Sequence, residues 1–433
     1  MSWCVPSQTS IPIASQDMMT PAFLPLSRFR ILLSLLLALV PFSDVKAQTD
    51  SVLYITPTQL EPEGKGEVRL NFDNLTFVRD NEYKGLLVKG YTLPGMWLEP
   101  TLSYQPLRHL KVEAGLHMLH YWGANKYPNL NYSDISSWKG GQTQKGFHCV
   151  PIFRAQAQLS PEVKLVLGTI YGKQNHGLIQ PLYNEELNLS ADPEAGLQVL
   201  WDCRPLWLDA WINWESFIFR NDNHQESFTF GLSTRFRPSR RDARVQCYLP
   251  LQTIFQHRGG EINTDASDRS IKTWFNAATG VGLNIPLRTK FPVHLNFEAD
   301  VAAYRQQAGT ALPFDQGLGF CVKASARLSD FTIGAGYWQC HNFISIFGNP
   351  LLGTLSVDDR ATTYRNPRTF TGQFEYAKRL GHGFSWGMQC MVFATLPADA
   401  YNAQQGWKRQ PTGVSLAAGA FLRIHPSFLL KRL

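Results

Sequence analysis

The stretch "FPVHLNFEADVAAYR" (residues 291–305) alternates apolar and polar side chains for more than ten residues. Every second position from 293 to 303 is apolar, whereas the positions between them include His294, Asn296, Glu298 and Asp300. Successive side chains of a strand point to opposite faces, so the pattern predicts a strand with one apolar and one polar face. Two classes of protein use such strands, soluble β-proteins and transmembrane barrels.

The same alternation recurs along most of the chain. Clear examples are "LWLDAWINWESFIF" (206–219) and "LGFCVKASARL" (318–328). We predict sixteen strands, with fourteen as the alternative count, since a barrel strand needs about ten residues to cross a bilayer. Their expected ranges are 66–78, 95–106, 108–121, 147–160, 162–175, 194–203, 205–219, 225–237, 242–258, 271–287, 291–305, 315–328, 330–346, 364–379, 382–396 and 411–425.

The connections between these strands alternate in length, and this feature separates the two classes. Short connections lie at 106–109, 159–162, 203–206, 238–242, 287–291, 328–331 and 379–382, and longer ones lie at 79–94, 122–146, 176–193, 259–270, 306–314, 347–363 and 397–410. Only the connection 220–224 is short at a position where the alternation requires a long one. Tight periplasmic turns and extended outer loops produce this alternation, whereas Greek-key sandwiches do not. The fold class predicted is all-β, a single antiparallel up-and-down transmembrane barrel.

A closed barrel also explains the polar faces. It pairs every backbone donor and acceptor without leaving a strand edge in the bilayer. Ionised side chains at mid-bilayer cost about 2–4 kcal/mol each, so Glu298 and Asp300 are expected to face the lumen.

The N-terminal residues predict an export signal. Arg28 and Arg30 precede the apolar run "ILLSLLLALVPF" (31–42), and "SDVKA" then ends at Ala47. This order is typical of a secretory signal peptide, and the run is short for about 30 Å of hydrocarbon. We predict cleavage after Ala47, with translation starting at Met18 or Met19 as an alternative. The expected division is a signal peptide (1–47), a short periplasmic segment (48–65) and the barrel (66–433).

Composition excludes several other classes. The net charge of +7 is spread along the chain and does not form the basic cluster that is typical of nucleic-acid-binding proteins. Seven cysteines without CxxC spacing predict neither a disulfide scaffold nor a metal site, and no cofactor is predicted. Aromatic residues near strand ends fit interfacial girdles, with packed core aromatics as the alternative. The girdle candidates are Trp97, Tyr104, Tyr121, Trp122, Trp211, Trp214, Trp274 and Trp338.

In its leader, its alternating strands and its turns the chain resembles Gram-negative outer-membrane barrels of the porin type. Three stretches are similar to porin-like barrels of the Bacteroides group, "NEYKGLLVKGYTLPGMWLEPTLSY" (81–104), "NHGLIQPLYNEEL" (175–187) and "LDAWINWESFI" (208–218). The resemblance implies an outer-membrane channel for passive diffusion or uptake of small hydrophilic solutes. It also implies outer-membrane lipids and lipopolysaccharide as surroundings, the barrel-assembly machinery as a partner, and a homotrimer.

On this interpretation the inward polar residues line a pore. The pore-lining candidates are Arg69, Asn71, Asp73, Lys111, Glu113, Arg154, Lys164, Asp209, Asn213, Glu215, Asn296, Glu298, Asp300, Lys323, Arg327 and Glu375. Tyr127, Tyr132 and Trp138 lie in the longest connection, which either folds inward as a constriction loop or stays at the surface. The alternative is a non-conducting barrel whose charges pair internally and which serves adhesion, assembly or partner binding.

A barrel enzyme of the lipase or protease type is the third alternative. His176 lies near Glu185 and Glu186, and "VDDR" (357–360) carries paired carboxylates. A serine hydrolase needs a Ser, a His and an orienting residue that face one another, and the chain has no GxSxG. His117 and His120 are three apart and face opposite sides of one strand, so they cannot chelate a metal together. The sequence therefore predicts a protein that is not an enzyme.

Overall fold

The computed structural model describes residues 53–122, 148–218, 225–240, 242–260, 270–287, 293–359 and 361–433. Contacts along the chain divide it into two units, 1–47 and 48–433, and every described residue belongs to the second. The signal peptide and the aromatic residues Tyr127, Tyr132 and Trp138 lie outside the described residues. These assignments, and the domain boundaries, stay predictions.

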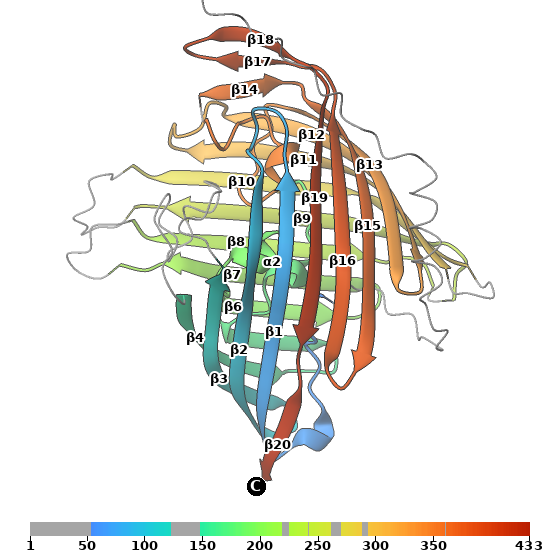
Figure 1. Ribbon diagram of the computed structural model, residues 1–433. Coiled ribbons are helices and arrows are strands. Elements are labelled where there is room, and N and C mark those ends of the chain that lie inside the picture. The colour runs from blue at the N-terminus through green and yellow to red at the C-terminus, as the bar shows by residue number, and fades with distance from the viewer. Residues whose placement is uncertain are drawn as a thin grey trace, which may run out of the picture. The chain divides into compact units, whose positions relative to one another are not determined.

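The described strands close into an antiparallel barrel of sixteen consecutive strands, which confirms the predicted fold (Figure 1). Each strand pairs with its neighbours in sequence, and the last one closes on β1 in two pieces, β19 and β20. The barrel strands are β1 (Glu67–Glu82), β2 (Tyr91–Leu107), β3 (Leu110–Tyr121), β4 (His148–Gln158), β5 (Val163–Thr169), β6 (Ala195–Asp202), β7 (Leu206–Ser216), β8 (Ser227–Phe236), β9 (Gln246–Arg258), β10 (Lys272–Leu287), β11 (Val293–Ala308), β12 (Gln316–Leu328), β13 (Phe331–His341), β15 (Arg368–Gly381), β16 (Phe384–Thr395), β19 (Gly413–Ile424) and β20 (Ser427–Arg432).

The alternation of side chains sets which face of each strand is outward. On β11, Phe297 and Val301 are 44% and 51% exposed, whereas Asp300 is 3% exposed. The apolar face of the opening stretch is therefore the outer wall of the barrel, as predicted. β5 is shorter than predicted because the chain leaves the wall after Thr169 and turns into the interior.

The connection 170–194 fills part of the barrel interior. It contains the short helices η3 (Lys173–His176) and α2 (Leu187–Ser190), and α2 lies behind β1 and β2 in Figure 1. Inward aromatic side chains bind its backbone, since Trp97 Nε1 donates to the Asn188 carbonyl at 3.1 Å and the Tyr121 hydroxyl donates to the Leu189 carbonyl at 3.0 Å. Leu187 and Leu189 pack against the same wall, so burial of apolar surface stabilises the inserted conformation.

A second connection, 342–357, packs against the opposite wall and contains η4 (Pro350–Leu352). Trp338 is 1% exposed, and its Nε1 donates to the Leu352 carbonyl at 2.7 Å. Asn276 donates to the Ile344 carbonyl at 2.9 Å. The two inserted connections meet at a bridge between Tyr183 and Phe347. The barrel half that carries the long connections therefore contains a packed core.

This packing corrects the assignment of several aromatic residues to interfacial girdles. Five of the candidates point inward and are almost fully buried, namely Trp97, Tyr121, Trp211, Trp274 and Trp338. Trp122 and Trp214 are 44% and 45% exposed and agree with a girdle. The prediction was wrong for the five because it took inward faces to be polar, whereas a filled barrel needs apolar side chains on both faces of its strands.

Residues 53–58, which we call the strap, also contact the inward face of the barrel. Arg423 Nη1 donates to the carbonyls of Leu53 and Ile55 at 3.1 and 3.0 Å. Thr56 exchanges two hydrogen bonds with Asn175 of the first inserted connection, at 3.1 and 2.8 Å. The strap thus ties the closing strand β19 to the inserted connection, and the short helix η1 (Pro62–Gly64) follows it.

Three short strands form a separate sheet at the end of the barrel opposite the C-terminus (Figure 1). They are β14 (Thr362–Arg365), β17 (Ala398–Asn402) and β18 (Gly406–Gln410). They belong to the connections between β13 and β15 and between β16 and β19, both of which the sequence predicted to be long.

The six cysteines of the described residues are all free thiols. None of the helices in this part of the chain is long and apolar enough to cross a membrane.

Candidate active site in the barrel interior

The first inserted connection gathers titratable side chains from the wall formed by β1 to β7. The three stretches quoted for the porin-type resemblance meet here, because Asn81 and Asp209 both bind residues of the 170–194 connection. No group of three or more His, Cys, Asp or Glu side chains in the described part of the chain is arranged to hold a metal ion.

Glu99 and His117 form a carboxylate–imidazole pair on the inward faces of β2 and β3. The distance between His117 Nδ1 and Glu99 Oε1 is 2.8 Å. The imidazole is fully buried, and its Nε2 has no hydrogen-bond partner among the described residues. A carboxylate on Nδ1 orients the ring and fixes the tautomer with its lone pair on Nε2. The geometry is that of a general base whose proton-accepting atom is unoccupied.

Register alone places these two residues together, although sequence reasoning missed the pair. The β2–β3 hairpin pairs Leu98 with Met118 and Thr101 with Gly115, which sets Glu99 opposite His117. The short connection at 106–109 could have given this register. His117 was considered only as a metal ligand, and for that role its spacing from His120 was wrong.

Lys173 of the inserted connection acts electrostatically on the same pair. Its backbone is left-handed, with φ of 59°, and its N–H donates to Glu194 Oε1 at 2.7 Å. Burial lowers the pKa of the Lys173 ammonium, while Glu99, Asp192 and Glu194 act in the opposite direction. Strained backbone conformations of non-glycine residues cluster at functional sites. Lys173 is thus a positive charge held among carboxylates within electrostatic range of the Glu99–His117 pair.

His176 has a different environment and a different role. Its Nδ1 lies 2.8 Å from Asp209 Oδ2 and its Nε2 lies 3.0 Å from Glu194 Oε2, so both ring nitrogens are occupied. The ring stacks on Trp211, with centroids 3.4 Å apart. Burial disfavours the charged ring, but Glu194 and Asp209 outweigh it and raise the pKa of His176 to about 9. His176 is therefore a buried imidazolium that fastens the inserted connection to β7.

Glu185 and Glu186 do not join His176, contrary to the grouping suggested by their spacing. Glu186 accepts hydrogen bonds from Asn81 Nδ2 at 2.8 Å and from the Tyr91 hydroxyl, and it lies 3.5 Å from Arg79 Nε. Glu185 accepts a hydrogen bond from Gln389 at 2.5 Å. Both carboxylates anchor the α2 region to the wall.

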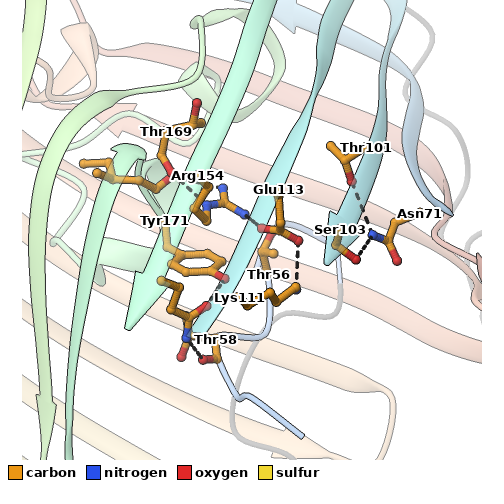
Figure 2. Close-up of polar contacts among 12 residues, drawn as sticks. Thr56, Thr58, Asn71, Thr101, Ser103, Lys111, Glu113, Arg154, Thr169 and Tyr171 are labelled. Carbon is orange, nitrogen blue, oxygen red and sulfur yellow. Dashed lines mark hydrogen bonds and ion pairs between the residues drawn. The ribbon is translucent and has the colours of Figure 1, made fainter. Parts of the chain in front are cut away.

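Several pore-lining candidates form a polar network around the strap (Figure 2). Glu113 lies 2.9 Å from Arg154 Nη1 and 2.8 Å from Lys111 Nζ, and the Arg154 guanidinium lies 4.0 Å from the centre of the Tyr171 ring. Lys164 donates to the Thr58 hydroxyl at 3.2 Å.

Other candidates on the same wall are also paired. Asp73 accepts two hydrogen bonds from Arg423, at 2.7 and 3.0 Å, and Arg69 pairs with Glu67 at 2.7 Å. Asn71, drawn apart from the Arg154 group in Figure 2, donates to the Ser103 hydroxyl at 3.0 Å.

The remaining candidates divide between β7 and the opposite wall. Glu215 accepts from Ser227 at 2.7 Å and from Gln256 at 2.8 Å, and Asn213 accepts from the Ala195 N–H at 2.8 Å. On the opposite wall Tyr248 donates to Glu298, and Asn296 donates to Tyr248 at 2.8 Å. Lys323 and Arg327 lie opposite Glu298 and His294 in register, while Asp300 and Glu375 are 3% and 8% exposed. Their role in lining a conducting pore stays a prediction.

The closed sixteen-strand barrel with apolar outer faces defines an outer-membrane β-barrel protein. The chain belongs to the family described as Lipid A 3'-O-deacylase-type, whose match covers residues 60–433. No curated protein sequence matches the chain. Because the family is named for an enzymatic activity, the prediction that the protein is not an enzyme was wrong. That prediction looked for a serine triad and did not consider a pair made by register across two strands.

Solved structures with similar folds are outer-membrane barrels. OccK8 (OprE) of Pseudomonas aeruginosa is 12% identical, with a TM-score of 0.47, covering 84% of this chain and 99% of that one. OccAB1 of Acinetobacter baumannii is 12% identical, with a TM-score of 0.45 and coverages of 87% and 100%. OmpT, an outer-membrane protein of Vibrio cholerae in its trimer form, is 8% identical, with a TM-score of 0.45 and coverages of 83% and 99%. At these identities and TM-scores the matches carry no argument about this chain's activity.

Proposed function

We propose that this protein hydrolyses an ester-linked acyl chain of lipid A, with His117 as the general base. The observation that carries the proposal is the Glu99–His117 pair, whose Nε2 is unpartnered in the interior of a barrel of the Lipid A 3'-O-deacylase-type family. A positioned imidazole of this kind contributes about 10²–10⁴-fold to a proton-transfer step.

The chemistry follows from the two nitrogens of the imidazole. His117 Nε2 takes a proton from water, and the resulting hydroxide attacks the ester carbonyl carbon. The positive charge of Lys173 favours the oxyanion that forms on the carbonyl oxygen. The protonated Nε2 then gives its proton to the sugar oxygen as the C–O bond breaks, which releases a fatty acid and a sugar hydroxyl. Glu99 stays ionised and stabilises the imidazolium between these two steps.

Substrate access requires a movement, because His117 is fully buried. The 170–194 connection packs against the same β2–β3 wall, and it carries Lys173 in its left-handed conformation. We infer that this connection shifts when the substrate binds, in the manner of active-site lids. A lid that closes over the ester also excludes bulk water from the reaction.

A passive channel, the function suggested by the porin-type resemblance, has less support. The strap and both inserted connections bind inward-facing side chains of opposite walls, and the polar candidates are largely engaged with one another. Small hydrophilic solutes, the assembly machinery and the homotrimer remain predictions from that resemblance.

The test is the mass of lipid A after incubation with the purified protein in detergent micelles. We expect the loss of one acyl chain, and a rate at least about 100-fold lower in His117→Asn. His120→Asn is the matched control, since His120 lies on the same strand but faces outward. Equal rates for His117→Asn and the unmodified protein would exclude His117 as the base, and an equal loss in His120→Asn would point to misfolding instead.

A further inference from the structure

The outer face of the three-stranded sheet carries an exposed aromatic pair. Tyr401 on β17 and Trp407 on β18 lie directly opposite in register, and their ring centroids are 5.2 Å apart. They are 41% and 61% exposed, so each presents much of its ring to the surroundings. Neither ring is needed to close a core.

The inner face of the same sheet is fixed to the barrel interior. Tyr364, Ala398 and Ala400 are at most 5% exposed and belong to the packed core that includes the second inserted connection. The Tyr364 hydroxyl accepts a hydrogen bond from the Leu86 N–H at 3.1 Å. The aromatic pair therefore stands on a rigid support, and little ordering entropy is lost when a ligand binds to it.

Cationic side chains lie beside the pair. The aromatic face carries two guanidinium groups and one carboxylate, whereas Lys408 lies in register with the buried Ala400 and therefore on the other face. Arg365 and Arg409 lie on the aromatic face on either side of Asp399, and Arg409 pairs with Asp399 at 2.9 Å while 63% of its side chain stays exposed. An exposed aromatic platform next to exposed guanidinium groups suits a ligand that combines a ring with a phosphate.

We propose that this face binds the phosphorylated sugar headgroup of an outer-leaflet glycolipid. The sugar ring lies against Tyr401 and Trp407, and the phosphate faces Arg365 and Arg409. The choice of a glycolipid rests on the proposed function, and the position of the sheet at the barrel end with the long connections agrees with it. The face acts as a docking site for the headgroup, separate from the Glu99–His117 pair.

The test uses a ligand that cannot be deacylated. A glucosamine disaccharide bisphosphate without acyl chains is titrated by calorimetry into the protein in micelles, and the unphosphorylated disaccharide serves as the comparison. We expect binding about tenfold weaker in Trp407→Ala, and about tenfold weaker for the unphosphorylated sugar. Trp214→Ala is the matched control, because Trp214 is an exposed tryptophan on the outer wall. The affinity of this variant for the disaccharide bisphosphate should be unchanged.

Equal affinities for Trp407→Ala and the unmodified protein would overturn the proposal. So would equal affinities of the unmodified protein for the phosphorylated and the unphosphorylated disaccharide, since the guanidinium groups would then play no part in binding. The outcome is independent of the ester site. Saccharide binding that depends on Trp407 without any deacylation would refute the proposed function alone, and deacylation without saccharide binding would refute the docking site alone.

Discussion

Replacing Arg423 by methionine should destabilise the barrel more than the loss of any surface charge. The Arg423 side chain is buried on the inward face of β19. It makes two hydrogen bonds to Asp73 and one each to the carbonyls of Leu53 and Ile55. Methionine keeps most of the apolar volume but removes the charge, so Asp73 loses its cation and the strap loses its attachment to β19.

The size of the effect follows from these contacts. Hydrogen bonds to charged groups contribute about 1.5–3 kcal/mol each, and removing one partner of a buried ion pair costs about 3–5 kcal/mol. We expect the free energy of unfolding to fall by about 3–5 kcal/mol, measured by urea titration in micelles with tryptophan fluorescence. Arg237→Met is the control, because Arg237 pairs with Asp202 at the surface and such pairs contribute about 0–1 kcal/mol.

The strap gives a second readout on the same variant. Once Arg423 is gone, residues 53–58 should become sensitive to a protease that leaves the unmodified barrel intact. Equal stabilities of Arg423→Met and Arg237→Met, together with an uncut strap, would show that Arg423 does not hold the strap in place. A double-mutant cycle with Asp73→Asn measures the coupling between the two side chains directly.

Three other perturbations follow from the site and the core. The pKa of His176 is raised from 6.5 to about 9. The charged ring therefore contributes about 3 kcal/mol to the free energy of unfolding below pH 6.5, and this contribution is lost as the pH rises through 9. His176→Gln should flatten this pH dependence in urea titrations. Trp338→Ala should lower the free energy of unfolding by about 3–5 kcal/mol, because it leaves a cavity and removes the indole hydrogen bond to the Leu352 carbonyl. Glu99→Gln should slow deacylation by about 10²–10⁴-fold while the melting temperature stays nearly constant, which separates a catalytic from a packing role.

The barrel could be predicted from the sequence because its signal repeats. The outer faces of strands such as β11 must be apolar, and the connections must alternate in length, so sixteen segments carry the same pattern. The observed strand ends differ from the predicted ones where the chain leaves the barrel wall early. At Thr169, for example, β5 ends and the backbone turns inward.

The filled interior could not be predicted in the same way. The connections 170–194 and 342–357 have no periodic pattern, and their stability comes from contacts with residues far away in the sequence, such as Trp97 and Asn276. The inward tryptophans were the available signal. They were assigned to girdles because a tryptophan near a strand end can face either the lipid or the lumen. The sequence does not show which residues fill the lumen.

The site was predictable in part. Asp209 was correctly placed on an inward face, but its partner His176 was grouped with two nearby glutamates. Sequence proximity is a poor guide inside a barrel, because residues far apart along the chain, such as Glu99 and His117, meet across strands. Applying the hairpin register at 106–109 would have found the Glu99–His117 pair.

Ion conductance of the purified protein in a planar lipid bilayer tests most directly whether the lumen is filled by the chain itself. We expect a folded, inserted barrel that shows no stepwise openings of porin size, since the strap and both inserted connections occupy the interior. Stepwise openings of that size from the unmodified protein would contradict it, and would return the inward charged residues to the role of a pore lining.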